Sequence, residues 1–158
     1  MDKLPLDSLL SIKRAGMVLV NSHCRLAVGI DNQSGDIGPF AGSPIRADGG
    51  IIRTAEREFR EESLGVFGKI PHHVVAKGLA VYNEEELIIF CPLDFNERDA
   101  MTKFNKKVKA DSEMKQLFFC DPGELVELLC SKTGKTPIYE RVRRLLIDTI
   151  HNEGNFLA

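Results

Sequence analysis

Apolar runs of strand length alternate with polar, glycine-containing segments in the first third of the chain. The runs at 15–20 (AGMVLV) and 24–31 (CRLAVGID) each predict a buried strand, and residues 21–23 (NSH) predict a tight turn between them. Residues 31–50 contain five Gly and two Pro, a composition typical of a loop, with a short strand expected near Phe40. This part of the sequence therefore predicts a strand pair followed by a glycine-rich loop.

The pattern changes to helical spacing at residue 51. Apolar positions recur every three or four residues over 51–64, and Gly65 is a natural place for the helix to end. Beyond the helix, 72–82 and 86–95 predict two antiparallel strands joined by a turn at 83–85.

The remaining segments complete a mixed α/β pattern. Residues 5–12 predict a short helix or a lead-in segment. The last third predicts a polar and basic connector at 101–112 and a strand at 113–121. A helix with Pro in its first turn follows at 122–131, and a final amphipathic helix at 137–152. Strands and helices in this order predict a single α/β domain over residues 1–158, with a largely non-alternating sheet.

Composition and charge narrow the range of functions. The chain has 158 residues, 43% of them hydrophobic and 28% charged, as in an ordinary globular protein. A net charge of −2 gives no global basic field, so DNA is not an expected partner. The longest apolar runs are too short to span a bilayer, so no membrane association is expected. The four cysteines show no CxxC spacing, which argues against zinc and predicts reduced thiols in a cytoplasmic location.

The helix predicted over 51–64 carries an unusual concentration of carboxylates. At about 100° per residue, Glu58, Glu61 and Glu62 fall within about 100° of arc, beside the apolar stripe. Glu56 and Arg60 lie on the other flank, four residues apart, and predict a surface ion pair. The trio has two interpretations: a solvated helix face, or a platform for a cation.

The setting of the trio favours the cation. Three like charges at this spacing repel one another, and oxygen-rich clusters suit Mg²⁺ or Mn²⁺. Arg57, four residues before Glu61, is placed to orient that carboxylate. A strand pair and a glycine-rich loop lead into the helix.

With these neighbours, the helix resembles the signature of the Nudix hydrolase family, G-x5-E-x7-R-E-U-x-E-E-x-G-U, where U is a bulky apolar residue. Residues 57–62 (REFREE) match the R-E-U-x-E-E core at every position. Residues 65–66 (GV) resemble the closing G-U, with one extra residue before them. The order of strands and helices resembles the family over about residues 15–147.

The upstream loop departs from the family pattern. Gly42 stands 15 residues before Arg57, where the pattern has 14. The position eight before Arg57, normally Glu, is Gly49, with Asp48 beside it. These departures concern the conformation of the loop and the salt bridge that the missing Glu makes in the family.

The resemblance implies an α/β/α sandwich around a mixed β-sheet and a divalent-metal-dependent pyrophosphohydrolase. Carried over by position, Glu58, Glu61 and Glu62 hold Mg²⁺ or Mn²⁺ with the backbone carbonyl near Gly42. A carboxylate from a later loop joins such sites, and Glu113 or Asp111 is the candidate.

The chemistry expected of this site is the attack of water on a diphosphate linkage. The expected catalytic carboxylates are Glu58, Glu61 and Glu113, with either Glu61 or Glu113 as the base. Candidate substrates are capped RNA, dinucleoside polyphosphates, diphosphoinositol polyphosphates, nucleotide sugars and nucleoside triphosphates. Weaker candidates for binding the substrate are Arg57 and four further side chains: Lys103, Lys106, Lys107 and Phe40. The lysines also fit a solvated loop, and Phe40 equally fits the core.

Two other hypotheses fit the same residues. The irregular loop and the missing Glu are compatible with a Nudix-like module that binds a nucleotide or RNA without cleaving it. An unrelated α/β domain with an acidic surface helix is the third. The binding module predicts tight metal-independent binding of a ligand. The unrelated domain predicts that Glu61 and Glu62 have no role in metal affinity.

Overall fold

The computed structural model describes residues 12–130 and 138–153, so the segment expected at 5–12 lies almost wholly outside the described residues. Seven strands form one sheet. They are β1 (Arg14–Val20), β2 (Leu26–Asp31), β3 (Ile37–Gly38), β4 (Phe40–Gly42), β5 (Leu79–Tyr82), β6 (Glu86–Pro92) and β7 (Met114–Cys120). The helices are α2 (Ile51–Glu62), α3 (His72–Val75), α4 (Glu97–Lys107), α5 (Pro122–Leu129) and α6 (Glu140–Glu153), with a 3-10 turn, η1, at Arg46–Asp48.

The strand β1 lies at the centre of this sheet and makes it mixed. One edge of β1 pairs in parallel with β6 along its whole length, whereas β5 joins β6 antiparallel. The other edge is shared, because the first half of β1 pairs with β4 and the second half with β2, both antiparallel. β2 pairs in turn with β7. This division brings β4 alongside α2.

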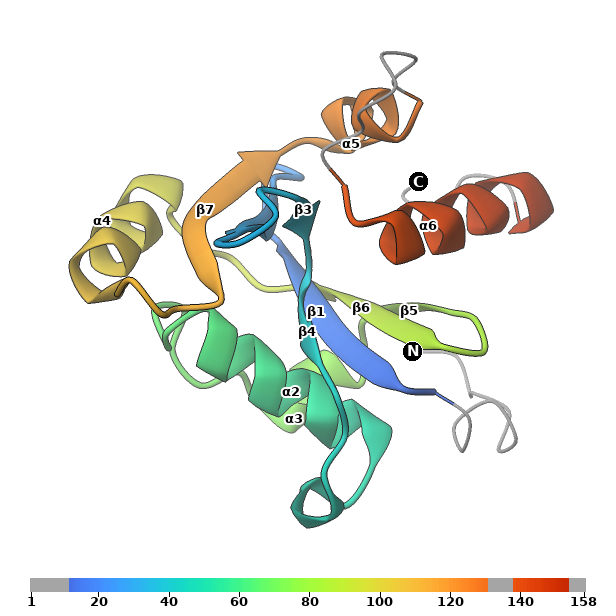
Figure 1. Cartoon of the computed structure of the whole chain (residues 1–158), viewed down its shortest axis with the longest axis horizontal. Helices are drawn as coiled ribbons and strands as arrows, with labels where there is room; N and C mark the ends of the chain where they lie inside the picture. Colours follow the sequence, from blue (N-terminus) through green and yellow to red (C-terminus); the bar gives the residue numbers. More distant parts are fainter. Residues whose placement is uncertain (1–11, 131–137, 154–158) are drawn as a thin grey trace.

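Helices cover both faces of the sheet (Figure 1). Side chains alternate along β1, so that Met17 and Leu19 pack with α2, α3 and α4 while Val18 packs with α5 and α6. Residues of β6 alternate in the same way, with Ile89 on the first side and Ile88 on the second. A strand buried on both faces reads as a continuous apolar run, as β1 and β6 do. The expected α/β/α sandwich around a mixed sheet is confirmed.

The segment expected to be a strand over 72–82 is a strand only from Leu79. Residues His72–Val75 form the short helix α3, which begins after Pro71. The β-branched Val74 and Val75 favoured a strand in the sequence. One turn of helix instead buries Val75 fully in the core, on the same face of the sheet that α2 covers.

The segment expected to be a connector at 101–112 is mostly helix, because α4 runs from Glu97 to Lys107. Asn96 caps it by accepting a hydrogen bond from the backbone N–H of Asp99 at 2.9 Å. Ala100 and Phe104, four residues apart, are its buried stripe. The polar and basic surface of α4 hid this stripe from the sequence reading. In the part of the chain that the structure describes, no helix is long and apolar enough to cross a membrane.

Candidate active site

The helix α2 is held at both ends by residues with left-handed backbone. Gly49, with φ of 75°, separates η1 from the start of α2, and Leu64 and Gly65 turn the chain away at its end. The N–H of Gly65 donates to the carbonyl of Arg60 at 2.9 Å, which closes the last turn. The buried residues of α2 include Thr54, Ala55 and Phe59, which fix the helix against the sheet, and also Glu62.

The side chain of Arg57 joins the carboxylates of α2 to the preceding loop. Its guanidinium forms ion pairs with Glu58 at 2.8 Å and with Glu61 at 3.1 Å. It also donates to the carbonyl of Ser43 at 2.9 Å. Only 18% of the side chain is exposed, so these groups use most of its donors. The contact expected between Arg57 and Glu61 is present, and the Arg57 side chain acts within the protein rather than as a free cation.

Asp48 forms the salt bridge that the sequence left in question. Its carboxylate accepts from Nε and Nη2 of Arg57 at 2.7 and 3.1 Å and from the hydroxyl of Thr54 at 2.8 Å. Asp48 lies one position further upstream in the sequence than the Glu of the Nudix pattern. The 3-10 turn η1 and the left-handed Gly49 that follows it nevertheless place Asp48 beside Arg57. The Arg57 guanidinium lowers the pKa of Asp48 to about 2.

Glu58 lies against the backbone of β4 at Gly42. A Cβ atom added at Gly42 would be 2.2 Å from the Cδ of Glu58, so the carboxylate occupies space that any other residue would fill. Burial raises the pKa of Glu58, Arg57 opposes the shift, and the charges of Glu61 and Glu113 add to it. Glu58 and the Gly42 backbone, expected to lie together, are therefore in contact.

Glu62 is a buried carboxyl group in contact with a second one. Its side chain accepts from the N–H of Ala41 at 2.8 Å and contacts the carboxyl of Glu113. Burial raises the pKa of Glu62 well above its ordinary value, and the contact with Glu113 raises it further. Two carboxyl groups this close are stabilised by a shared proton or by a cation.

The structure brings the predicted carboxylates together from two parts of the chain. Glu113, just before β7, is held by a hydrogen bond from the N–H of Asn32 to its carbonyl at 2.8 Å. It is Glu113, and not Asp111, that contacts Glu62. Glu61 is 55% exposed and turned toward Arg57. Within residues 12–130 and 138–153, no three His, Cys, Asp or Glu side chains are arranged as a metal-binding group.

The chemistry of this donor set nevertheless fits a hard divalent cation. Its donors are carboxylate oxygens and backbone carbonyls, which Mg²⁺ and Mn²⁺ prefer. Glu58 lies in the space that a Cβ at Gly42 would fill, so that carboxylate and the β4 backbone share one small volume.

The side chains expected to bind substrate are divided. Lys103, Lys106 and Lys107 are exposed on α4. Lys107 donates to the carbonyl of Leu64 at 3.3 Å, just beyond the end of α2, and Lys103 pairs with Asp99 at 3.0 Å. Of the two alternatives for Phe40, the structure shows the core position and not a surface for base stacking. Its side chain is 0% exposed and packs edge-on against Phe59, so a base cannot stack on it while the core is closed.

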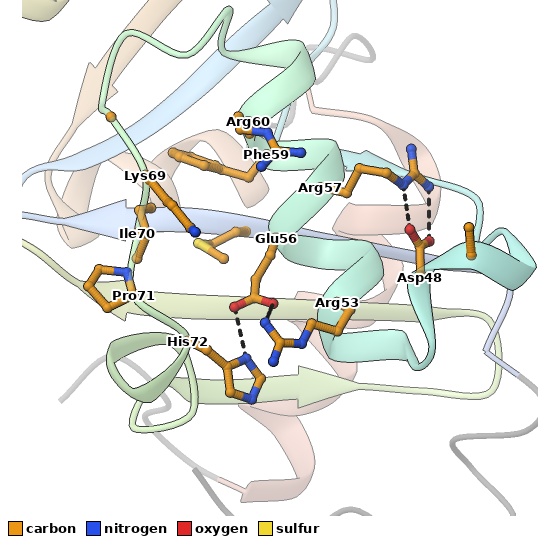
Figure 2. A pocket seen from close by; sticks show the side chains of 13 residues that line it. Asp48, Arg53, Glu56, Arg57, Phe59, Arg60, Lys69, Ile70, Pro71 and His72 are labelled. Carbon is orange, nitrogen blue, oxygen red and sulfur yellow. Dashed lines mark hydrogen bonds and ion pairs between the residues drawn. The ribbon is translucent and has the colours of Figure 1, made fainter.

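The opposite flank of α2 differs from the sequence expectation as well. Glu56 does not pair with Arg60 among the described contacts. It pairs with Arg53 at 3.4 Å and with Nδ1 of His72 at 2.9 Å (Figure 2). These residues border a hollow of about 580 Å³ between α2 and the loop at 68–72, which sequence reasoning missed because its two walls are far apart in the chain. None of the carboxylates Glu58, Glu61 and Glu62 lines it.

Comparison with known proteins gives a structural relationship without a sequence relationship. No protein-family model and no curated protein matches the chain. An Ap4A hydrolase from C. elegans, solved as a binary complex, aligns with a TM-score of 0.52 and 13% identity, covering 89% of this chain and 96% of the hydrolase. A protein from Deinococcus radiodurans aligns with 16% identity over 85% of this chain and 81% of its own chain. Its TM-score of 0.47 is too low to carry an argument about this chain. At 13% identity the likeness shows the fold alone: the chain has the Nudix-like fold that this Ap4A hydrolase also has.

Proposed function

We propose that the protein is a divalent-metal-dependent pyrophosphohydrolase that cleaves a diphosphate linkage in a nucleoside diphosphate derivative. The observation that carries this proposal is the contact between Glu62 and Glu113, a buried carboxyl beside a second carboxyl, next to Glu58 on the same helix. Such a group is unfavourable in an apolar setting unless a cation or a proton compensates it. The Nudix-like fold is consistent with this chemistry.

The residues that would hold Mg²⁺ or Mn²⁺ are Glu58, Glu61 and Glu62, with the backbone carbonyl of Gly42. When bound, the ion supplies charge neutralisation at the phosphates and a bound water of lowered pKa. Glu58 and Glu62 are fixed by their contacts with β4, at Gly42 and at the Ala41 N–H. They form the rigid part of the platform.

The remaining residues have roles in orientation and proton transfer. Arg57 orients Glu58 and Glu61 and is itself fixed by Asp48. Either Glu61 or Glu113 accepts the proton of the attacking water, since both are exposed carboxylates, in contrast to the buried Glu62. Lys103, Lys106 and Lys107 face solvent on α4, where they would attract the distal phosphates of a highly charged substrate.

The alternative of an inactive binding module rested on the missing Glu of the family pattern. The Asp48–Arg57 ion pair supplies the interaction that this Glu would have made, which weakens that argument. Candidate ligands are the same for both functions: a phosphoanhydride small molecule, such as the Ap4A named for the structural neighbour, or capped RNA.

The test is the release of phosphate or nucleotide from a panel of phosphoanhydrides with Mg²⁺ and then Mn²⁺. The panel contains capped RNA, a dinucleoside polyphosphate, a diphosphoinositol polyphosphate, a nucleotide sugar and a nucleoside triphosphate. We expect metal-dependent cleavage of at least one compound, lost in Glu61→Gln and retained in Glu127→Gln. Glu127 is an exposed residue of α5, and α5 packs on the face of the sheet opposite to α2. Glu127→Gln therefore controls for the loss of one negative charge.

Separate variants distinguish the two candidate bases. Glu113→Gln and Glu61→Gln are compared for the pH dependence of cleavage and for the rise in melting temperature on adding metal. The base variant loses the acidic limb of the pH profile, whereas a ligand variant also loses the metal-induced stabilisation. Absence of cleavage throughout the panel, with tight metal-independent binding of one compound, would instead support the binding module.

A further inference from the structure

The hollow between α2 and the loop at 68–72 has the form of a ligand site (Figure 2). Its volume of about 580 Å³ lies within the range of small-molecule pockets, roughly 300–1,000 Å³. Beneath the hollow lie the core residues Met17 and Phe59, which are 0% and 2% exposed and give it rigid support rather than a contact surface. Ile70 and Pro71 form part of the loop wall. An apolar surface of this kind suits a flat organic group.

The side chains that line this hollow carry a net positive charge. Six lining side chains are charged at neutral pH, four cations and two carboxylates, for a net charge of +2 with His72 neutral: Arg53, Arg57, Arg60, Lys69, Asp48 and Glu56. The whole chain, by contrast, carries −2. The hollow is thus a local positive site on a protein that is slightly acidic.

The four cations are not equivalent. Arg57 is paired with Asp48, and Arg53 is paired with Glu56. Within the described residues, the guanidinium of Arg60 and the ammonium of Lys69 have no hydrogen-bond or ion-pair partner. The two side chains lie on the two walls, Arg60 on α2 and Lys69 on the loop (Figure 2). They are therefore the groups free to bind an anion.

We propose that this hollow binds a small organic phosphate monoester, such as a nucleoside monophosphate. Its phosphate lies between Arg60 and Lys69, and its flat group lies against Ile70 and Pro71 of the loop wall. A guanidinium presents a fork of donors that matches phosphate oxygens, and a lysine adds a mobile point charge. The apolar loop wall of Ile70 and Pro71 is the reason for an ester and not inorganic phosphate alone.

The site lies on a different flank of α2 from the proposed metal ligands, although Arg57 and Asp48 border both. The hollow opens on the flank of α2 that carries Arg60, while Glu58 and Glu62 face β4 on the other flank. Binding here requires no divalent metal, because only cationic side chains contact the phosphate. This independence separates the proposal from the proposed hydrolase, since either can fail alone.

The experiment is isothermal titration of the full chain with AMP in the presence of EDTA. Adenosine tests the apolar loop wall alone, and inorganic phosphate tests the cations alone. We expect saturable binding of AMP at one site, with adenosine and phosphate each at least tenfold weaker. Both Arg60→Gln and Lys69→Gln are expected to weaken AMP binding about tenfold, the loss of one charge-assisted hydrogen bond.

Matched controls remove the same charges elsewhere. Arg98→Gln on α4 and Lys115→Gln on β7 change exposed residues that do not line the hollow, and each is expected to change AMP affinity less than twofold. Arg60 and Lys69 are exposed as well, so all four variants are expected to keep the melting temperature of the wild type.

Three results would overturn the proposal. The first is no saturable binding of AMP by the wild type. The second is equal weakening by Arg98→Gln or Lys115→Gln, which would mean a diffuse charge effect. The third is binding that requires Mg²⁺ and disappears in Glu61→Gln, which would place AMP at the carboxylates instead.

Discussion

Asp48 and Arg57 face each other across the junction of η1 and α2, joined by two hydrogen bonds of 2.7 and 3.1 Å. The carboxylate also holds the hydroxyl of Thr54 and the N–H of Ile45. Arg57 continues the network to Glu58 and Glu61. One aspartate outside the helix thus fixes the arginine that orients two of the proposed metal ligands.

Replacing Asp48 should therefore affect both stability and the site. Asp48→Ala leaves Arg57 without its main partner, and we expect a loss of about 2 kcal/mol in the free energy of unfolding, as for hydrogen bonds between charged groups. We also expect a smaller rise in melting temperature on adding Mg²⁺, because Glu58 and Glu61 lose their fixed neighbour. Urea unfolding and thermal melts measure both effects. Asp111→Ala is the control, since Asp111 is exposed and does not contact Glu62; equal effects in the two variants would contradict the role of Asp48.

The same ion pair predicts a dependence of stability on pH. The pKa of Asp48 is about 2 in the folded protein, below its ordinary value of 3.8, so the unfolded chain binds more protons between these values. The stabilisation is present above about pH 4 and is lost as the pH falls toward 2. The difference in unfolding free energy between the wild type and Asp48→Asn should shrink over this interval. A difference that stays constant from pH 6 to pH 2 would show that the carboxylate charge is not its source.

Much of the fold could be predicted because apolar pattern alone specifies buried strands and helices. β1, β2, β6 and β7 follow from runs of apolar residues, and α5 follows from Pro122 in its first turn. The failures have local causes. Two valines suggested a strand where Pro71 starts the helix α3, and lysines obscured the spacing of Ala100 and Phe104 in α4.

The candidate site was predictable only as far as one helix carries it. Spacing alone places Glu58, Glu61 and Glu62 on one side of α2. The choice of Glu113 over Asp111 depends on the register of β7 against β2, which no short motif encodes. The role of Asp48 depends on a 3-10 turn and a left-handed glycine, and the fate of Phe40 depends on its packing against Phe59.

Gly42 offers a direct test of the contact between β4 and the carboxylates. A methyl group there would be 2.2 Å from the Cδ of Glu58, so Gly42→Ala must displace that side chain or the strand. We expect a cost of about 1–3 kcal/mol in stability and a loss of most of the Mg²⁺-induced rise in melting temperature. Titration of both forms with MgCl₂ in thermal melts measures this.

The control for Gly42 is Gly123→Ala in the first turn of α5. Its nearest neighbour would be a carboxylate oxygen of Asp121 at 3.2 Å, and the position is helical, where Ala is the better residue. This variant should keep the full Mg²⁺ response. If Gly42→Ala keeps it too, the β4 backbone does not take part in metal binding.

The lysines of α4 are predicted to act on substrate binding and not on the chemical step. Lys103 and Lys106 are exposed, and Lys107 donates to the carbonyl of Leu64 just beyond the end of α2, the helix that carries the carboxylates. For a substrate with several phosphates, the double variant Lys103→Gln/Lys106→Gln should raise KM about threefold to tenfold, more strongly at low salt, with kcat unchanged. Steady-state kinetics at two ionic strengths measure the change. Lys115→Gln is the control on β7, and a fall in kcat with constant KM would show that the α4 lysines act on the chemical step instead.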